Sequence, residues 1–586
     1  MKVDNIKIAR IFREIADLLS IKGENPFRIR AYEKAADILE HLSGNIEELY
    51  REGKLKQIPG IGKGILEKIE TIIKTGTLPL YEQLKSNFPP GLIEIISIPD
   101  VGPKTAKLLY EKMGIKNVEE LEDAAKKGML RGLAGMGERK EENILRGIKL
   151  YRMRSSRMLL GRALPLVNAV ISELTTKASS LIEKISPAGS LRRGKETVGD
   201  IDILATSSNP DSLMDAFSNL SFVEEVLVKG ETKTSILTDQ GFQMDLRVVS
   251  SESFGAALQY FTGSKSHNIK LRERAIRKGL KINEYGVFNQ EGRKIAGEKE
   301  EEVYSILNLH FIPPELREDR GEIEAAEKGS LPDLLTEKDI KGDLHIHTTY
   351  SDGKNDIEEM VEGAIAKGYQ YIAITDHSSS LKVARGLSIE SILSQIKKIK
   401  ELNSKLNGFK ILTGAEVNIN KDGSLDFPEE VLSKLDVVIA AIHTGFKQDE
   451  KTITNRVIKA LRHPMVNILA HPSGRLIGER EPYAIDLNEV LNVAAEEGVW
   501  VEINSQPERL DLTDYWAMEA KKKGVKIVIN TDSHNKDSLD FIKLGVVTAR
   551  RGWLEKGDVV NTLSLHQLLK LLQDKKLKGG YRVRKN

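Results

Sequence analysis

Nine histidine and carboxylate residues in the C-terminal half of the chain have the types and spacing of a metal centre. Each follows or ends a short apolar run of the kind that forms a buried strand. Nine ligands are too many for one ion, and a set rich in imidazole favours Zn²⁺ or Mn²⁺ over Mg²⁺. Two or three ions are therefore expected, and they would generate a hydroxide that attacks a phosphate ester near neutral pH. The nine residues are His345, His347, Asp352, His377, Glu416, His443, His471, Asp532 and His534.

A second set of acids lies near the middle of the chain. Asp200 and Asp202 alternate in GDIDIL, so both carboxylates point to one side of a strand. Asp245, in QMDLRVV, belongs to a later strand and completes a cluster of three. Three close carboxylates repel one another unless a divalent cation neutralises them, and Mg²⁺ suits an all-oxygen ligand set. Two such ions would activate a 3′-hydroxyl and stabilise a triphosphate during in-line displacement.

The segment before these acids, AGSLRRG, has groups suited to phosphate. Gly189 and Ser190 offer backbone N–H and hydroxyl donors, and Arg193 offers a forked guanidinium. A solvated surface strand is the alternative interpretation of the acids, because an isolated Asp-x-Asp is a weak signal. The preceding Gly-Ser turn and the third acid on a later strand favour a catalytic site.

Three glycine-containing turns, in residues 57–67, 97–107 and 132–143, each precede an expected helix. Such turns expose backbone N–H groups, and the helix adds its positive end, so together they suit a phosphate without reading sequence. Ordinary connections between helices would explain one copy, whereas three copies followed by basic residues favour DNA binding. The residues concerned are Gly60, Gly62, Gly102, Lys104, Gly135 and Gly137.

The elements that must position these groups change character along the chain. Residues 1–150 show apolar residues at three- and four-residue steps, which predicts short amphipathic helices. From about residue 160, a helix leads into strand-like segments that predict a small α/β sheet. From about residue 341, seven short apolar runs alternate with helical stretches, which predicts a parallel (β/α) barrel. The carboxyl ends of the barrel strands converge at one rim, where the nine ligands would meet.

Composition limits the classes of function only loosely. The 88 Lys and Arg residues nearly balance the 86 Asp and Glu residues, so the net charge of +2 does not identify a partner. A local basic stretch does occur over residues 138–162. The absence of cysteine excludes disulfides and thiolate metal sites. With no apolar run of membrane-spanning length and no signal peptide, we expect a cytoplasmic protein without a membrane partner.

Residues 1–320 resemble the polymerase β type of family-X DNA polymerases. The resemblance rests on the glycine turns, GSLRRG, GDIDIL, MDLR and YFTGSKSHNIKLRERA. It implies that Asp200, Asp202 and Asp245 bind Mg²⁺ and that Gly189, Ser190 and Arg193 contact the incoming triphosphate. It also implies catalytic Lys68, which would form a Schiff base with a 5′ sugar as a lyase. Lys265 departs from the eukaryotic relatives. The remaining implied nucleotide-binding residues are Tyr260, Phe261 and Gly263 at the sugar, with Asn268 and Arg272 at the minor-groove side of the base pair.

The C-terminal part, about 337–575, resembles the PHP (polymerase and histidinol phosphatase) domain with all nine ligand positions filled. Arg385 and Arg475 lie near the expected rim and would pair with phosphate. The fused architecture resembles bacterial and archaeal polymerase X. It implies gap filling in base excision repair, with 3′-5′ exonuclease, 3′-phosphatase or abasic-site endonuclease activity at the barrel. The implied substrates are gapped or nicked DNA and dNTPs, and we expect a monomer.

The expected fold is multidomain, with helix-hairpin-helix domains, a nucleotidyltransferase palm and a distorted (β/α)7 barrel. Two other functions stay open: a polymerase tethered to a small-molecule phosphatase, and a non-catalytic scaffold that binds DNA ends. Competition by duplex DNA separates a nuclease from a small-molecule phosphatase, and failure to bind metal would favour the scaffold. The expected boundaries are 1–85 (lyase-like domain), 86–155 (second helical DNA-binding domain), 156–255 (palm), 256–318 (thumb-type subdomain), 319–336 (linker) and 337–575 (barrel).

Overall fold

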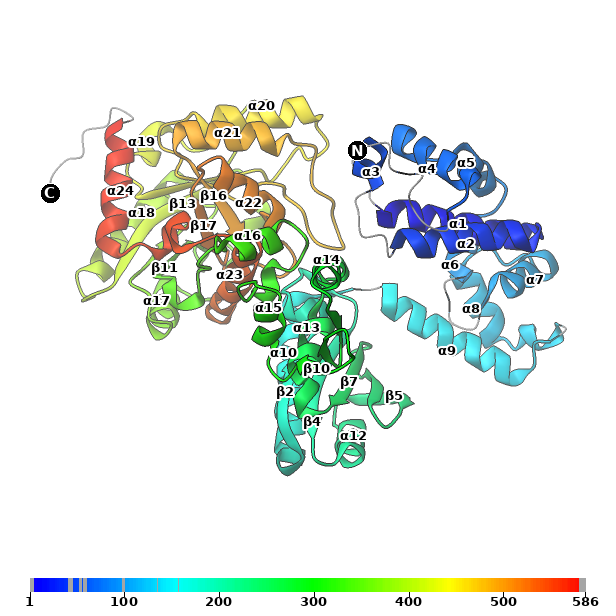
Figure 1. Ribbon diagram of the computed structural model, residues 1–586. Helices are drawn as coiled ribbons and strands as arrows, with labels where there is room; N and C mark the ends of the chain where they lie inside the picture. Colours follow the sequence, from blue (N-terminus) through cyan, green and yellow to red (C-terminus); the bar gives the residue numbers. More distant parts are fainter. Residues whose placement is uncertain are drawn as a thin grey trace.

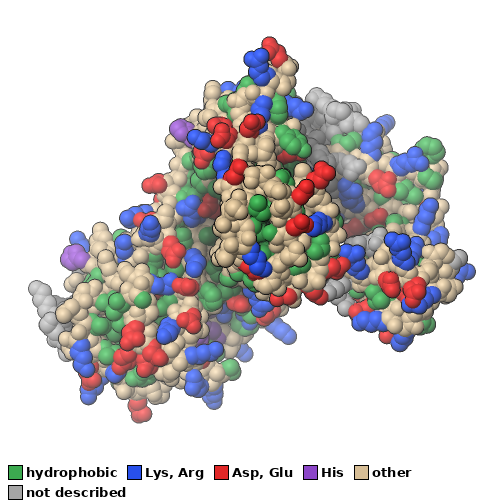
Figure 2. Space-filling view, turned by 90° about the horizontal axis from the view of Figure 1, so that it is seen from below, with side chains coloured by type: hydrophobic (Ala, Val, Ile, Leu, Met, Phe, Trp, Pro, Cys, Tyr) green, Lys and Arg blue, Asp and Glu red, His purple; other side chains and the backbone are tan. Residues whose placement is uncertain are grey.

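The computed structural model describes residues 5–40, 46–51, 55, 61–96, 98, 101–133, 135–155 and 157–578. Along the sequence, a helical part is followed by a central α/β part and then by a parallel barrel (Figure 1). The expected fold class is thereby confirmed. On the face shown in Figure 2, basic and acidic side chains are interspersed. No helix in the described part of the chain is long and apolar enough to span a membrane.

The helical part has its own apolar core, formed by the inward faces of amphipathic helices. Gly62, Gly102 and Gly137 each stand directly before a helix, namely α4, α7 and α9. Gly60 lies outside the described residues. The helices are α1 (Asn5–Lys22), α2 (Pro26–Glu40), α3 (Ile46–Arg51), α4 (Lys63–Thr75), α5 (Pro79–Ser86), α6 (Gly91–Ile96), α7 (Pro103–Met113), α8 (Val118–Lys126) and α9 (Glu138–Ser155).

The central part contains a five-stranded sheet in the order β2-β4-β7-β6-β5. Strands β4 and β7 are parallel, and the other neighbours are antiparallel. The strands predicted around the central acids are therefore confirmed. The elements are β1 (Met158–Leu159), α10 (Leu160–Ala178), β2 (Ile182–Pro187), α11 (Gly189–Arg192), β3 (Thr197–Val198), β4 (Ile201–Ser207), α12 (Pro210–Ser218), β5 (Val223–Lys229), β6 (Lys233–Thr238) and β7 (Gln243–Val249).

A smaller unit follows this sheet and packs around its own core. The stretch 319–336, expected to be a linker, contains α16, and buried Glu322 at the start of that helix hydrogen-bonds His267 at 2.7 Å. This stretch is thus packed against the preceding unit. The elements are α13 (Phe254–Thr262), α14 (Lys265–Arg277), β8 (Lys281–Asn283), β9 (Gly286–Phe288), β10 (Lys294–Ala296), α15 (Glu300–Ile306) and α16 (Glu322–Lys328).

The C-terminal part is a nearly closed barrel of seven parallel strands in sequence order. A parallel bridge between Ile346 and Ser533 brings the first strand to the end of the last. The strands are buried on both faces, as continuous apolar runs require. They are β11 (Gly342–Ile346), β12 (Tyr371–Ile374), β13 (Lys410–Asn418), β14 (Val437–Ala441), β15 (Ile468–Leu469), β16 (Trp500–Asn504) and β17 (Ile527–Asn530).

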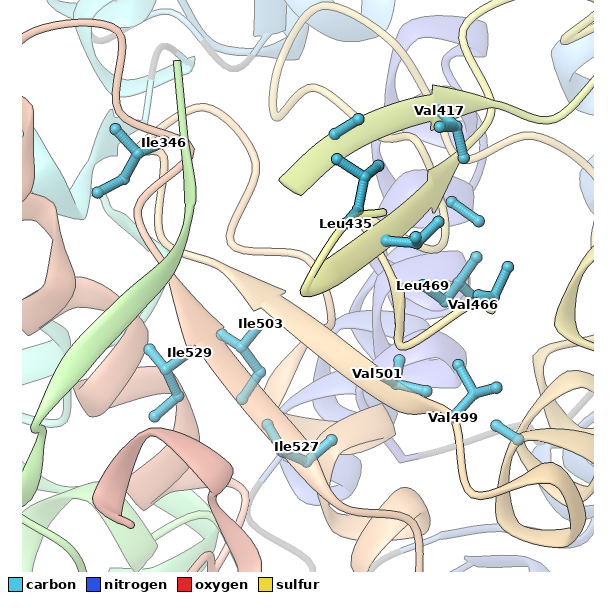
Figure 3. Packing of buried hydrophobic residues seen from close by; sticks show 14 of the residues in the cluster. Ile346, Val417, Leu435, Val466, Leu469, Val499, Val501, Ile503, Ile527 and Ile529 are labelled. Carbon is cyan, nitrogen blue, oxygen red and sulfur yellow. The ribbon is translucent and has the colours of Figure 1, made fainter. Parts of the chain in front are cut away.

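Helices cover the barrel, and their apolar faces join alternate strand residues in one core. Figure 3 shows Val501 and Ile503 of β16 beside Ile527 and Ile529 of β17 in this core. All seven predicted strands are present. The helices are α17 (Ile357–Ala366), α18 (Ile389–Asn403), α19 (Glu429–Leu432), α20 (Glu450–Leu461), α21 (Leu487–Glu497), α22 (Asp514–Lys522), α23 (Ile542–Arg551) and α24 (Leu565–Lys578).

Candidate active sites

All nine expected metal ligands lie at the carboxyl end of the barrel. His345 and Glu416 lie within β11 and β13, and the other seven lie in the segments that follow β11, β12, β14, β15 and β17. Parallel strands carry these ends to the same rim, which explains how residues almost 190 positions apart come together. The barrel therefore assembles all nine side chains in one place.

Glu416 is the centre of this cluster. Its side chain is 1% exposed, and five imidazoles surround its two oxygens. Such crowding around one carboxylate leaves no room for bulk water. The ring nitrogens lie at 2.9 Å for His377 Nδ1 and His471 Nε2, 3.1 Å for His443 Nε2, 3.3 Å for His345 Nε2 and 3.5 Å for His347 Nε2.

Eight of the nine ligands, all but His471, form three overlapping groups within which the ligand atoms lie within 4.8 Å of one another. Several buried ring nitrogens, including His345 Nε2 and both nitrogens of His347, form no hydrogen bond within the described structure. Buried nitrogens without partners are costly, and a bound cation removes that cost. The donor set therefore fits metal ions. The groups are His347, Asp352, His377 and His534; His345, His347 and Asp532; and His377, Glu416 and His443.

The electrostatics of the cluster keep its acids ionised. Burial alone would raise the pKa of Asp352, but His534, His347 and His377 hold it at about 2. In the same way, neighbouring histidines hold the pKa of Glu416 well below its usual range despite burial. Burial lowers the pKa of His347 to about 4, which keeps that ring neutral. Despite burial, the neighbouring acids raise the pKa of His534 to about 9 and also raise the pKa of His345 and His377. Because ionised carboxylates and neutral imidazoles are the forms that bind metals, metal binding at these three rings would release protons.

Sequence reasoning missed Glu502, which supports two of the ligands from beneath. It is fully buried in β16, and its Oε1 lies 2.8 Å from His345 Nδ1. Its Oε2 accepts the backbone N–H of His471 at 2.9 Å. A carboxylate on one ring nitrogen orients the other nitrogen toward a metal. The available signal was an acid inside the apolar run WVEIN, like Glu416 inside its own strand.

Arg475, expected to pair with phosphate near the rim, has protein partners in this structure. Its guanidinium instead bonds Glu196 of the central part at 2.6 Å and the backbone oxygens of Arg509 and Leu510. Arg385 is exposed, on the loop before α18. Arg509 does lie beside the cluster, with Nε 3.9 Å from Asp532 Oδ2.

The central acids also lie close together. Asp202 on β4 and Asp245 on β7 are direct partners in the parallel register, and Asp200 stands one residue before β4. Asp245 is buried and paired with Lys233 Nζ at 2.5 Å. Burial, together with the charges of Asp200 and Asp245, raises the pKa of Asp202 to about 6. A cluster that holds on to a proton in this way fits a divalent cation.

The Gly-Ser turn forms α11, directly beside these acids. Gly189 has a φ of +63°, and a Cβ placed there would lie 2.6 Å from Asp202 Oδ2. Ser190 is the second residue of this helix. Arg157, from the basic stretch 138–162, donates to the hydroxyl and backbone oxygen of Thr197 at 2.8 and 2.7 Å. It adds a cation to the loop between the turn and the acids.

Arg193 connects this turn with the segment expected at the sugar. Its Nη1 donates to the backbone oxygen of Thr262 at 2.5 Å, and Gly263 follows directly. The rings of Tyr260 and Phe261 stand edge to face at 5.2 Å. Arg247 lies over the ring of Phe261 at 4.6 Å.

The expected base-pair contacts lie on the next helix and are fixed by the same segment. Asn268 donates to the backbone oxygen of Tyr260 at 2.8 Å and accepts from Gln259 at 2.7 Å. Arg272 donates to the backbone oxygen of Asn268 at 3.3 Å. The expected nucleotide-binding residues thus meet where α11, α13 and α14 converge.

Lys68 lines a cavity of about 350 Å³ in the helical part, together with Arg28, Tyr32 and Lys34. Its Nζ donates to the backbone oxygen of Gly64 at 2.8 Å and lies 5.9 Å from the ring centre of Tyr32. The cavity therefore presents three cations beside an aromatic ring. Lys104 stands in the first turn of α7, and Gly135, with a φ of +78°, stands two residues before Gly137.

Comparison with known proteins matches four segments of the chain to family models and nearly the whole chain to one relative. Family models match for a helix-hairpin-helix domain (residues 3–78), a SAM-like helix-hairpin-helix tandem (92–149), a DNA polymerase beta thumb (257–318) and a PHP domain (343–506). Over 561 residues, 95% of this chain and 97% of the relative, the chain is 40% identical to a DNA polymerase/3′-5′ exonuclease PolX of Bacillus subtilis.

The C-terminal part has shorter relatives. It is 32% identical over 249 residues to a probable phosphatase of Thermoanaerobacter sp., which is 41% of this chain and 96% of that protein. It is 33% identical over 202 residues to a probable phosphatase of Acetivibrio thermocellus, which is 33% of this chain and 78% of that protein.

Proposed function

This chain belongs to the PolX family of DNA polymerase/3′-5′ exonucleases, and from that premise we propose that it fills short gaps in DNA during base excision repair. The observation that carries the polymerase assignment is the pairing of Asp202 with Asp245 on adjacent strands, beside the turn that begins at Gly189. Carboxylates next to a phosphate-binding turn are what nucleotidyl transfer needs.

In the polymerase site, Asp200, Asp202 and Asp245 would hold Mg²⁺, which supplies charge neutralisation and activates the primer hydroxyl when bound. The turn Gly189–Ser190 and Arg193 then hold the triphosphate by backbone, hydroxyl and guanidinium donors. Tyr260, Phe261 and Gly263 border the sugar, while Asn268 and Arg272 face the minor groove of the new base pair. The substrates are gapped or nicked DNA and dNTPs.

At the barrel, the nine ligands would hold Mn²⁺ or Zn²⁺, which supplies a hydroxide for phosphoester hydrolysis when bound. Glu416 and Asp532 keep the histidines oriented around them, and Glu502 orients His345. Water exclusion by the buried rim strengthens these interactions. We assign to this site the 3′-5′ exonuclease, with 3′-phosphatase and abasic-site endonuclease activity as further uses of one chemistry.

The helical part would bind DNA through the backbone of its turns at Gly60, Gly62, Gly102, Gly135 and Gly137, with Lys104 beside the second turn. Lys68 would act as a lyase on a 5′ sugar, since its cavity also holds Arg28 and Lys34 for the neighbouring phosphate. We further propose the domain boundaries predicted above, a monomeric state and a cytoplasmic location.

The test uses a 5′-labelled primer on a one-nucleotide gap with Mn²⁺, with and without dNTPs. The native chain should extend the primer with dNTPs and shorten it without them. Asp200→Ala/Asp202→Ala should lose only extension, and His345→Ala/His347→Ala should lose only shortening. If the histidine variant still shortens the primer, the barrel is not the site of the nuclease activity.

A second function for the barrel is hydrolysis of small phosphomonoesters, favoured by the phosphatase relatives that cover this part of the chain. Hydrolysis of p-nitrophenyl phosphate in the presence of duplex DNA distinguishes the two. A nuclease site should be inhibited by the duplex, whereas a site shaped for small substrates should not respond.

A further inference from the structure

The segment after the triphosphate turn is held by the barrel as well as by the palm. Arg551, the last residue of α23, is 4% exposed. Its Nη1 donates to the backbone oxygen of Arg193 at 2.6 Å, and its Nη2 donates to Asp514 at 2.6 Å. Arg551 of the barrel thus fixes the backbone of Arg193 in the palm. The side chain of Arg193 in turn contacts the nucleotide segment, residues 260–263.

Glu318 joins the two arginines. Its Oε1 accepts from Arg193 Nε at 3.0 Å and from Arg551 Nη1 at 3.1 Å. The side chain is 15% exposed, so solvent screens these contacts little. Arg193 is consequently held through both its backbone and its side chain by one connected network.

Close packing surrounds this network. Gly194 has a φ of +64°, and a Cβ there would lie 2.1 Å from Val547 of α23. Two residues on, Glu196 pairs with Arg475 of the barrel at 2.6 Å. The turn therefore cannot shift without moving α23 or breaking buried contacts.

The barrel helix that contacts the palm, α23, follows two metal ligands of the barrel in the chain. Asp532 and His534 follow β17, and the next long helix of the chain is α23. The helix α23 packs against β17, the strand that precedes Asp532 and His534, and its last residue contacts Arg193 of the palm.

We propose that Arg551 is a positioning residue for polymerisation: together with Glu318 it fixes Arg193 for the triphosphate, so the barrel completes the nucleotide site. This inference rests on the proposed polymerase function. A guanidinium with several donors in a rigid plane suits the role, because it holds a carbonyl and two carboxylates at once. Prior fixing of Arg193 removes the cost of ordering it when the nucleotide binds.

The test is single-nucleotide incorporation into a one-nucleotide gap by the full chain, with dNTP concentration varied. Arg551→Gln should raise KM for dNTP about tenfold with kcat changed less than about threefold, because binding rather than chemistry is lost. All four dNTPs should shift by the same factor, since the triphosphate is common to them. Arg551→Lys should give an intermediate KM, because it keeps a donor.

Lys543→Gln is the matched control: Lys543 lies on the same helix, is half exposed and pairs with Asp540 at 3.8 Å. Its KM should equal that of the native chain. Primer shortening without dNTPs should stay native in Arg551→Gln, which shows that the barrel is folded.

Glu318→Gln provides a second route that leaves the barrel sequence intact. It should raise KM alone, and the double variant with Arg551→Gln should be no worse than the stronger single variant, because both act through Arg193. Unchanged KM in either single variant overturns the proposal, as does an equal loss of kcat and of primer shortening. Failure of the native chain to extend any primer would instead refute the polymerase function.

Discussion

The two candidate metal sites of this chain are built in opposite ways. In the barrel, Glu416 is buried among five imidazoles, and Glu502 lies behind them. In the palm, Asp200 is exposed, and Asp245 is neutralised by a lysine. The first site is enclosed and supported by a further carboxylate, whereas the second is open at one edge.

This difference matches what each site must bind. An enclosed set of imidazoles and carboxylates holds ions tightly and keeps them between turnovers. An open carboxylate cluster with a built-in cation is stable without metal and admits ions together with a nucleotide. The contrast predicts a resident metal centre in the barrel and a substrate-coupled one in the palm.

The largest expected effect comes from removing one central acid of each site. Glu416→Gln should reduce primer shortening on the order of a thousandfold or more, and Asp245→Asn should do the same to extension. Each variant should keep the other activity, as measured on the same labelled primer. Loss of both activities in either variant would show that the sites are not separate.

Glu502→Gln tests whether the barrel site depends on its supporting carboxylate. Shortening and metal affinity should fall about 10- to 100-fold, because the orientation of His345 is weakened. Metal content measured after dialysis provides the readout that is independent of activity. Extension serves as the internal control, and native metal content in this variant would argue against the supporting role.

The pH dependence of extension probes the open palm site. Asp202 has a pKa raised to about 6, while Lys233 and Gln243 hold the pKa of Asp245 low despite burial, so the cluster takes its proton at Asp202. Mg²⁺ needs the ionised form. The rate should be level above pH 6 and fall about tenfold per unit below it.

Raising Mg²⁺ should move this break to lower pH, because the ion and the proton compete for one carboxylate. The measurement is kcat/KM for dNTP at two Mg²⁺ concentrations, from about pH 5 to about pH 8, a range that brackets the pKa of Asp202. A break that does not move with Mg²⁺ would assign it to a different group.

The smallest expected effect concerns Lys233. Lys233→Met removes a partly exposed cation that competes with metal for Asp245, so the Mg²⁺ concentration for half-maximal extension should fall about threefold. The barrel activity should not change. A rise in the required Mg²⁺ would mean that Lys233 helps to assemble the site rather than occupying it.

Prediction from the sequence was strongest where local pattern and chemistry agree. Six of the seven barrel strands are short apolar runs that contain or precede a ligand, so both the strand and the ligand are visible in the sequence. The supporting role of Glu502 was not predicted, because the sequence does not show which histidine an acid within a strand contacts. The pairing of Arg475 with Glu196 was missed for a similar reason, because the position of Arg475 shortly after His471 in the sequence does not show which group its side chain contacts.

The sequence by itself determined the element types, the barrel and the identity of the acids and histidines, because periodicity and residue chemistry are local properties. Only the tertiary structure decided which groups support them. The carboxylate behind His345 and the contact of Arg551 with Arg193 join residues far apart in the chain, and the pairing of Asp245 with Lys233 depends on the register of two adjacent strands. Such contacts depend on how helices and strands pack against one another, and a local sequence pattern does not predict that packing.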